Sequence, residues 1–548
     1  MVTLSKQQVC QRYIFKIHSS RLRRSDWKLN LTLSDARNNH EVEEIVALAD
    51  SQVLTWIDEL NGITDADDKA KTIKAKIMEL KKEPVSPNIK RQIRKLYTEL
   101  DNIQFKPDYM FLVIDREKDY RRACEGFYIN GIKYKRLLGT NGGVKMSTIV
   151  FISERLHPEI TRRIENGRNV NKPLVPAKLE AYKALSCSAS IPVSEPRGIA
   201  VVTDCETEFL SDIFYLNDEG VKEPTLELRK NEKVELNESD GYGIMLPRLA
   251  QRWSEELNLD YIVSGVNTRY SWEKGMVFTF DFVNFAEQIA KNYMIKDAWG
   301  NDVDVRSVEL ILTTSMVKLW DCYSSCEDYL QHSRENKYNF CITKTCPETL
   351  ESERALNYQF IQSYNLDDDD IDELIRGDVN EINDVLSEDY VKSILFLKGK
   401  NLNEKNVLSM KNEYTKALMI EPSLLDDSYI RGNIYYAIKG RIDRAKVGVI
   451  NVHGNFSMVS GDPYSLCQHI FGLEVTGLLK AGEIYNKYWK DIGADKLACF
   501  RAPMTAHPNI RKVSVHRSSE ADYWYQYMET CTLLNSWDTA AHALNGCD

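Results

Sequence analysis

Short apolar runs of the kind that form β-strands occur in two blocks of this chain, and a long stretch with helical spacing separates the blocks. The turn pair Asn130-Gly131 punctuates the first block, and the second block begins near Ile434, with residues 447–453 as its clearest strand. Two strand-rich blocks joined by helices predict an α+β protein of several domains. The strand-like runs of the first block are residues 111–114, 126–129, 147–152, 199–203, 276–280 and 308–313.

Helical spacing marks two other parts of the chain. Residues 71–80 and 88–100 carry Ile and Leu at helical intervals among lysines and arginines, and Pro84 and Pro87 separate them, which predicts a helical hairpin. Its basic face is either solvated or a contact for a nucleic-acid backbone, and both interpretations stay open. The acidic run at residues 367–370 is interpreted as a solvated helix start and not as a metal site.

These patterns divide the chain of 548 residues into five segments. The expected order is a helical N-terminal region at 1–105, a mixed α/β region at 106–183, a first β-barrel at 184–326, a helical linker at 327–430 and a second β-barrel at 431–548.

Charge and hydropathy exclude several classes of protein. The 71 Lys and Arg against 81 Asp and Glu give a net charge of −10, which argues against a histone-like grip on nucleic acid. An enzyme that threads nucleic acid through an internal channel can still be acidic outside. The first residues lack the apolar core of a signal peptide, and no apolar run approaches the roughly 18 residues of a membrane span. We therefore expect a cytoplasmic protein with no membrane partner.

The twelve cysteines are scattered and are expected to be reduced thiols. One group has spacings that could enclose zinc, but a C-x-x-C pair is missing from both of its halves, so buried thiols are preferred over a structural zinc site. The members of this group are Cys322, Cys326, His332, Cys341 and Cys346.

The last hundred residues contain the most specific motifs. Arg501-Ala-Pro503 is followed by His507 and, at a distance, by Asn545-Gly-Cys-Asp548. This order resembles the catalytic half of the two-barrel RNA polymerases, in which an R-[AP]-P-x-x-x-H element precedes an N-A-D-F-D-G-D loop. The resemblance is to the single-chain phage and prophage enzymes and the gene-silencing RNA-dependent RNA polymerases. It implies two double-psi β-barrels that face each other across a catalytic cleft.

The resemblance also implies roles for these residues. Three carboxylates on such a loop hold two Mg²⁺ ions, and Asp548 would be the first of them. The others would then belong to a part of the protein beyond Asp548 that is truncated, separately encoded, spliced or interrupted, so we expect this chain to be inactive alone. Arg501 and Asn545 would bind the ribose hydroxyls of the incoming nucleotide. A structural role for Arg501, and no role for Asp548, stay open as alternatives.

The first strand-rich block offers a second set of motifs. Asp240-Gly-Tyr-Gly243, Arg269 and Lys274-Gly275 resemble elements of the other barrel, whose lysines neutralise the nucleotide's phosphates. Lys274 would act as a point charge on those phosphates with Arg269 beside it, and a solvated turn lysine is the alternative. The second basic residue of this barrel is not identified, and the three residues that could supply it are Lys318, Arg248 and Arg252.

The predicted function is template-directed transfer of nucleoside monophosphates from NTPs to an RNA 3′ end, with Mg²⁺ as cofactor. Its partners would be a nucleic-acid template, of RNA or DNA, and the RNA product, in the cytoplasm of the host if a phage encodes the chain. A scaffold that binds nucleic acid without catalysis is the alternative. A nuclease has no support, because no cluster of His and carboxylates has metal-ligand spacing. Gly461-Asp-Pro463 is interpreted as a turn, and Asp462 receives no catalytic role.

Overall fold

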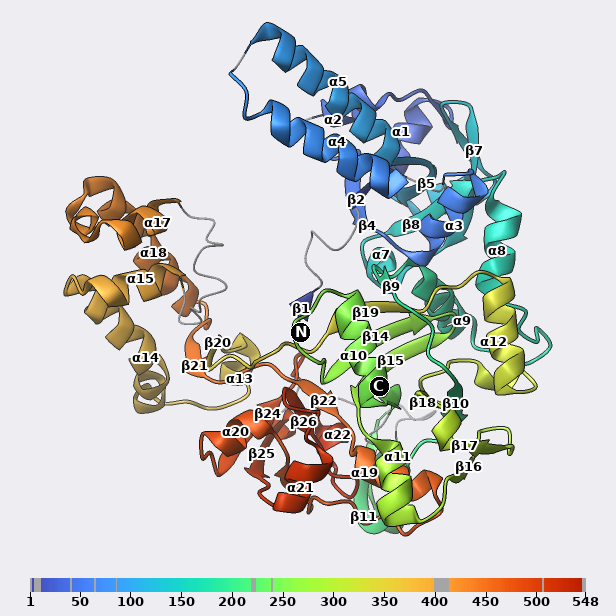
Figure 1. The fold of residues 1–548 in the computed structure, drawn as a ribbon, viewed down its shortest axis with the longest axis vertical. Helices are drawn as coiled ribbons and strands as arrows, with labels where there is room; N and C mark the ends of the chain where they lie inside the picture. Colours follow the sequence, from blue (N-terminus) through green and yellow to red (C-terminus); the bar gives the residue numbers. More distant parts are fainter. Residues whose placement is uncertain are drawn as a thin grey trace.

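The structure is a computed structural model that describes residues 2–3, 11–39, 42–63, 66–84, 86–217, 223–237, 240–398, 413–504 and 507–544. Its sheets and helices form four parts along the chain (Figure 1). We call them the N-terminal body (11–183), the first β body (184–346), the helical segment (353–450) and the second β body (458–544). The predicted α+β fold with several domains and two β bodies is confirmed.

The N-terminal body is built on a seven-stranded sheet with the order β3-β6-β7-β8-β5-β2-β4. Residues 1–105 were expected to be helical, and this is wrong for their first half, because β2, β3 and β4 lie there. Strand β2 is buried on both faces, with Ile14 and Ile17 fully inaccessible, so its apolar residues do not alternate in the way of a half-exposed strand. The strands are β2 (Gln11–His18), β3 (Lys28–Leu29), β4 (Ile45–Ala49), β5 (Phe105–Val113), β6 (Phe127–Ile129), β7 (Ile132–Leu138) and β8 (Thr148–Ser153).

The helices of this body include the predicted hairpin. Helices α4 and α5 pack through a small apolar core centred on Ile73, Ile77 and Leu100, and Ser86 caps α5 by accepting a hydrogen bond from the Ile89 amide. The predicted turn is also present: Asn130 and Gly131 both have positive φ, as a tight two-residue turn between β6 and β7 requires. The helices are α1 (Ser19–Arg24), α2 (Leu33–Arg37), α3 (Gln52–Leu60), α4 (Ala66–Leu80), α5 (Pro87–Gln104), α6 (Glu117–Cys124), α7 (Asn141–Lys145), α8 (His157–Glu165) and α9 (Pro176–Lys183).

The first β body contains an eight-stranded sheet in which β1-β19-β14-β15-β13-β18-β10 is the main path and β9 pairs with β19. Its strands confirm the predicted runs at 199–203, 276–280 and 308–313. β19 lies beyond residue 326, inside the stretch expected to be a helical linker. The strands are β1 (Val2–Thr3), β9 (Ile191–Pro192), β10 (Ile199–Val202), β13 (Tyr242–Met245), β14 (Gly265–Tyr270), β15 (Glu273–Thr279), β18 (Leu310–Thr313) and β19 (Cys341–Thr345).

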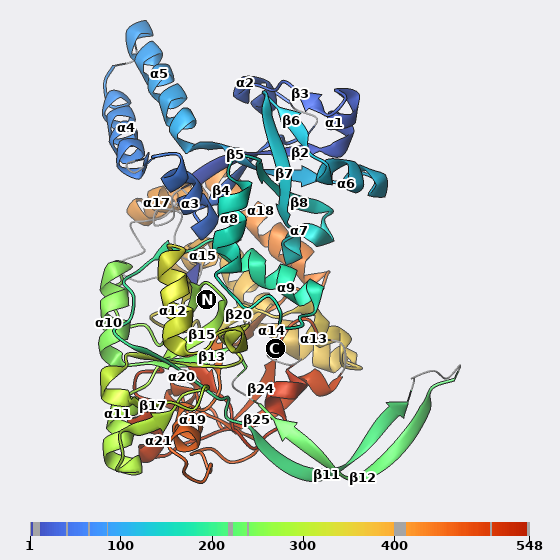
Figure 2. The same cartoon turned by 90° about the vertical axis from the view of Figure 1, so that its right-hand side faces the viewer.

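Several elements surround this sheet. A two-stranded ribbon of β11 and β12 projects from the body, as Figure 2 shows. The 3-10 helix η1 connects α9 to the sheet. These elements are η1 (Ala184–Cys187), β11 (Thr207–Asn217), β12 (Thr225–Leu236), α10 (Pro247–Glu256), α11 (Phe282–Phe285), β16 (Met294–Lys296), β17 (Asp302–Asp304) and α12 (Cys326–Glu335).

The helical segment begins as the acidic run predicts. The side chain of Asp367 caps α14 by accepting a hydrogen bond from the Asp370 amide at 2.9 Å. The Asp370 side chain in turn accepts from the Asp367 amide, which completes a capping box. The segment's end differs from the prediction, because α18 continues to Ala445 where the second strand-rich block was expected to have begun. The elements are β20 (Glu353–Ala355), α13 (Tyr358–Gln362), α14 (Asp368–Leu386), α15 (Tyr390–Lys398), α17 (Glu413–Ile420), α18 (Ser428–Ala445) and β21 (Asn451–His453).

The second β body contains two small sheets, β22-β26 and β23-β25-β24. A short helix, α20, lies between β23 and β24 and begins at Lys487. The elements are β22 (Met458–Ser460), α19 (Pro463–Ile470), β23 (Glu483–Ile484), α20 (Lys487–Asp491), β24 (Lys496–Phe500), β25 (Ile510–Val515), α21 (Ser519–Trp524), β26 (Cys531–Leu533) and α22 (Ala540–Ala543).

The two β bodies share one hydrophobic core. The ring of Phe285 lies 5.0 Å from that of Tyr464 and 5.6 Å from that of Trp524, and Phe280 stacks on Trp524 at 6.0 Å. Each such buried ring contributes about 1.5–3 kcal/mol relative to exposure. The two bodies are therefore held together by apolar burial and not by surface contacts alone.

Candidate active site

Arg269 and Lys274 lie directly opposite each other on the antiparallel strands β14 and β15. Directly paired residues project to the same face of a sheet, so both cations are on one face. The turn between the strands passes through Ser271, which has a φ of 51°, and Trp272, whose ring is buried. The buried turn holds the hairpin, while the Lys274 side chain remains exposed.

Gly275 is required because the backbone of Gly241 lies against it. A Cβ at position 275 would lie 1.9 Å from the carbonyl oxygen of Gly241, and the amide of Met276 donates to that oxygen at 2.9 Å. The Lys-Gly pair and the Asp240–Gly243 motif, which the sequence places 30 residues apart, are therefore one structural unit.

Lys318 is the third cation at this position. Its Nζ lies 3.6 Å from Oδ1 of Asp240, and its amide donates to the carbonyl of Trp272 at 3.1 Å. Desolvation by the surrounding protein lowers the pKa of Lys274, although its side chain reaches the surface, and the positive charges of Lys318 and Arg269 lower this pKa further, while Asp240 raises it. We call Arg269, Lys274 and Lys318 the cation cluster.

The other two residues that could have supplied this cation lie elsewhere. Arg248 and Arg252 both pair with the buried carboxylate of Glu309, at 3.2 and 2.8 Å. Sequence reasoning could not rank the three, because only the antiparallel pairing of β18 with β13 brings the residues after β18 beside the Asp240–Gly243 motif. That pairing is a long-range contact without a local signal.

Arg269 is positioned by its neighbours. Its Nη1 donates to the carbonyl of Thr268 at 2.6 Å and to Oδ1 of Asn267 at 2.8 Å, and burial lowers its pKa. The adjacent carboxyl of Glu273 is fully buried and accepts from the Thr268 hydroxyl, and burial raises the pKa of Glu273 to about 8. Glu273 is therefore mostly neutral at pH 7 and adds little negative charge to that of Asp240 beside the cluster.

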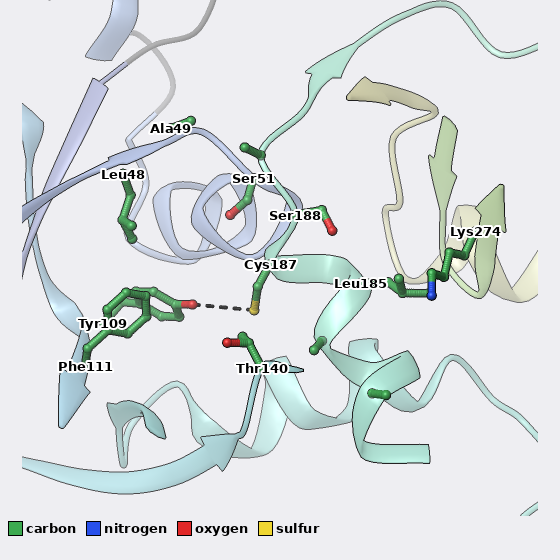
Figure 3. A pocket seen from close by; sticks show the side chains of 13 residues that line it. Leu48, Ala49, Ser51, Tyr109, Phe111, Thr140, Leu185, Cys187, Ser188 and Lys274 are labelled. Carbon is green, nitrogen blue, oxygen red and sulfur yellow. Dashed lines mark hydrogen bonds between the residues drawn. The ribbon is translucent and has the colours of Figure 1, made fainter. Parts of the chain in front are cut away.

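A cavity of about 390 Å³ adjoins Lys274 on the side of the N-terminal body (Figure 3). Its lining comes from β4, β5, α9 and η1, and the Lys274 ammonium points toward Leu185. Inside it, the hydroxyl of Tyr109 donates to Sγ of Cys187 at 3.4 Å. The cavity thus combines a mostly apolar lining with a cation at one end.

The Asp240–Gly243 motif also contacts the second β body. Tyr242 donates to the carbonyl of Gly461 at 3.3 Å and accepts from the hydroxyl of Ser460 at 3.1 Å. Neighbouring Asp462 is buried, caps α19 and accepts a hydrogen bond from the Tyr525 hydroxyl at 2.8 Å. These contacts give Asp462 a structural role. Through Tyr242, the first residue of β13, the motif beside the cation cluster therefore contacts the second body directly.

Arg501 follows β24 and is exposed. The last residue of β24, Phe500, pairs with Ile510, and Asn509 donates to the carbonyl of Ala543 at 2.8 Å. Arg501 and the residues that lead into position 545 therefore lie at the same end of the β24–β25 ribbon. Asn545 and Asp548 themselves are outside the described residues. Arg501 belongs to the second body and the cation cluster to the first.

The cysteines weighed for zinc have separate partners. Cys326 donates to the carbonyl of Ile199, Cys341 donates to that of Asn339, and the Sγ of buried Cys346 lies 3.7 Å from that of Cys531. His332 pairs with Asp328 at 3.0 Å. Within the part of the chain that the structure describes, no three His, Cys, Asp or Glu side chains are grouped to hold a metal ion.

No membrane-spanning segment was expected from the sequence. In the same described ranges, every helix is too short or too polar to cross a bilayer.

Comparison with known proteins gives three findings. The RNA dependent RNA polymerase family matches residues 85–521, more than half of the chain. The DNA-directed RNA polymerase YonO of Bacillus phage SPbeta is 28% identical over 374 residues, which are 66% of this chain and 42% of that protein. The RNA dependent RNA polymerase QDE-1 from Thielavia terrestris has a similar structure, with a TM-score of 0.52 and 16% identity, over 80% of this chain and 48% of that one. The chain thus spans less than half the length of each relative.

Proposed function

Because the chain belongs to the RNA-dependent RNA polymerase family, we propose that it is the substrate-binding part of a template-directed RNA polymerase, a nucleotidyltransferase that extends an RNA 3′ end. The observation that carries the proposal is the cation cluster. Three cations with one nearby carboxylate, that of Asp240, suit the triphosphate of an NTP, which is the substrate that this reaction consumes.

Each residue of the cluster has a distinct part. Lys274 is exposed and places a point charge on the phosphates, and Lys318 adds a second charge from the other side of the Asp240 loop. Arg269 is held by its own hydrogen bonds and raises the local potential without a large rearrangement. Charge developing on the leaving pyrophosphate is stabilised by groups already in place.

The second body supplies the remaining groups of the proposal. Arg501 and Asn545 would bind the ribose hydroxyls, and Asp548 would be a ligand of Mg²⁺, which in such enzymes polarises the attacking 3′-hydroxyl. The described residues offer no grouped set of metal ligands, so they do not fit a two-ion site. We therefore assign the described residues of the site to substrate binding.

The template is RNA or DNA, since one relative is named an RNA-dependent and the other a DNA-directed polymerase. The partners are that template, the RNA product and NTPs. Because one relative is a phage protein, we place the activity in the cytoplasm of a bacterial host.

The test is incorporation of labelled NTPs on primed and unprimed RNA and DNA templates. The 548-residue chain is assayed alone and joined to any polypeptide encoded downstream of Asp548. The proposal predicts template-dependent RNA synthesis that Lys274→Gln abolishes and Lys178→Gln, at an exposed lysine of α9, leaves unchanged. Template binding without synthesis in every form would favour the non-catalytic scaffold instead.

A further inference from the structure

The α4–α5 hairpin concentrates positive charge at the end that points away from the protein. Residues 74–95 contain eight Lys and Arg against two Glu, in a chain whose net charge is −10. Figures 1 and 2 both show the turn between the two helices at the far end of a projecting hairpin. The eight cations are all exposed: Lys74, Lys76, Lys81, Lys82, Lys90, Arg91, Arg94 and Lys95.

Four of these cations form a stripe along α5. Helical geometry places Lys90, Arg91, Arg94 and Lys95 on the side opposite the apolar residues that pack against α4. The stripe rises about 7.5 Å along the helix. Thr98 continues the same face as an uncharged residue.

Contacts within the described part of the hairpin account for little of this charge: Lys81 lies over the ring of Tyr97, with its Nζ 5.6 Å from the ring centroid. Among the described residues of the hairpin, none of the eight cations is in an ion pair, and the pairs Lys90/Arg94 and Arg91/Lys95 are like charges four residues apart, which destabilise a helix. Both helices are stabilised by their apolar core and the Ser86 cap. The like charges of the stripe therefore destabilise α5 in the free protein. A bound polyanion would remove this repulsion.

We propose that the distal end of the α4–α5 hairpin binds the phosphate backbone of a nucleic-acid duplex. The choice of nucleic acid over another polyanion rests on the proposed function, since a polymerase must hold template paired with product. A duplex is favoured over a single strand because the stripe itself contains no aromatic residue on which unpaired bases could stack, and the exposed ring of Tyr97 on the same helix is already in contact with Lys81, whose Nζ lies 5.6 Å from the ring centroid. Duplex DNA presents one phosphate charge per about 1.7 Å of axis, so the stripe can contact several at once.

The experiment measures binding of fluorescein-labelled 20-base-pair RNA and DNA duplexes, and of single strands, to the full chain by fluorescence anisotropy without NTPs. The variant is K90Q/R91Q/R94Q/K95Q, because Gln keeps helix propensity while removing charge. Its control is K118Q/R121Q/K178Q/K230Q, which removes four other exposed cations. Circular dichroism checks that both variants keep their helices.

The proposal predicts duplex binding about tenfold weaker or more at 100 mM salt for the hairpin variant, with the log Kd against log salt slope smaller by about 3. The control should bind as the wild type does. Equal binding by both variants would overturn the proposal, as would a loss confined to single strands. Because NTPs are absent, duplex binding can succeed while NTP binding by the cation cluster fails, so the two proposals fail separately.

Discussion

Glu273→Gln should make the first β body more stable at neutral and alkaline pH. The carboxyl is fully buried, its Oε2 has no hydrogen-bond partner in the structure, and burial raises its pKa from 4.5 to about 8. An unfolded chain releases this proton near pH 4.5, whereas the folded chain holds it to about pH 8. Folding stability is therefore lost as pH rises through this window.

The magnitude follows from the width of the window. Each pH unit between the two pKa values costs about 1.4 kcal/mol, so the wild type should lose roughly 3–4 kcal/mol between pH 5 and pH 8 from this group. The pKa of about 8 already includes the attraction of Arg269 for the ionised form. Gln keeps the acceptor for the Thr268 hydroxyl and has no acidic proton to release, so the variant should show none of this loss.

Hydrogen–deuterium exchange of the peptide that spans β14 and β15 provides the assay, since it reports local opening in a protein of several domains. With intrinsic rates corrected for pH, protection in the wild type should fall between pH 5 and pH 8 more steeply than in Glu273→Gln. Parallel pH profiles would refute the reasoning, because they would show that Glu273 titrates equally in both states.

Three further predictions concern neighbouring residues. Gly275→Ala should destabilise the protein by about 1–3 kcal/mol, seen as a lower Tm, because the new Cβ meets the Gly241 carbonyl; an unchanged Tm would contradict the close contact. Lys318→Gln should raise the pKa of Lys274, because a like charge is removed, and NMR titration of ¹³C-methylated lysines measures the direction; a fall would count against the cluster. Asp462→Ala should cost about 2–4 kcal/mol in urea unfolding, since it removes an N-cap and leaves the buried Tyr525 hydroxyl without its acceptor, and a neutral effect would contradict this role.

Local signals predicted elements well where they were self-contained. The capping box at Asp367, the paired left-handed residues at Asn130 and Gly131, and the proline-separated hairpin are each specified by a few neighbouring residues. Strand β2 was missed because Arg12 and Lys16 interrupt its apolar residues, although Arg12 is buried and pairs with Asp50 at 3.0 Å. Burial of a cation is a tertiary property that sequence pattern does not carry.

The start of the second β body was placed too early for a related reason. Helix α18 contains Ile and Tyr residues with strand propensity, yet Asp427 caps it, and its buried residues Ile430 and Ile438 pack at helical spacing. Tertiary packing outweighed local propensity there. In the candidate site, the sequence pattern led us to predict Arg269 and Lys274, which the structure pairs across β14 and β15, but it could not select Lys318, because that choice depends on how β18 pairs with β13.

The central claim is that Arg269, Lys274 and Lys318 bind a triphosphate. The most direct measurement compares the affinities of the chain for a fluorescent ATP analogue and for the matching AMP analogue, in the wild type, in K274Q/K318Q and in the control K118Q/K178Q. The wild type and the control should prefer the triphosphate, and this preference should disappear in K274Q/K318Q. If K274Q/K318Q keeps the full preference for triphosphate over monophosphate, the cation cluster is not the phosphate site.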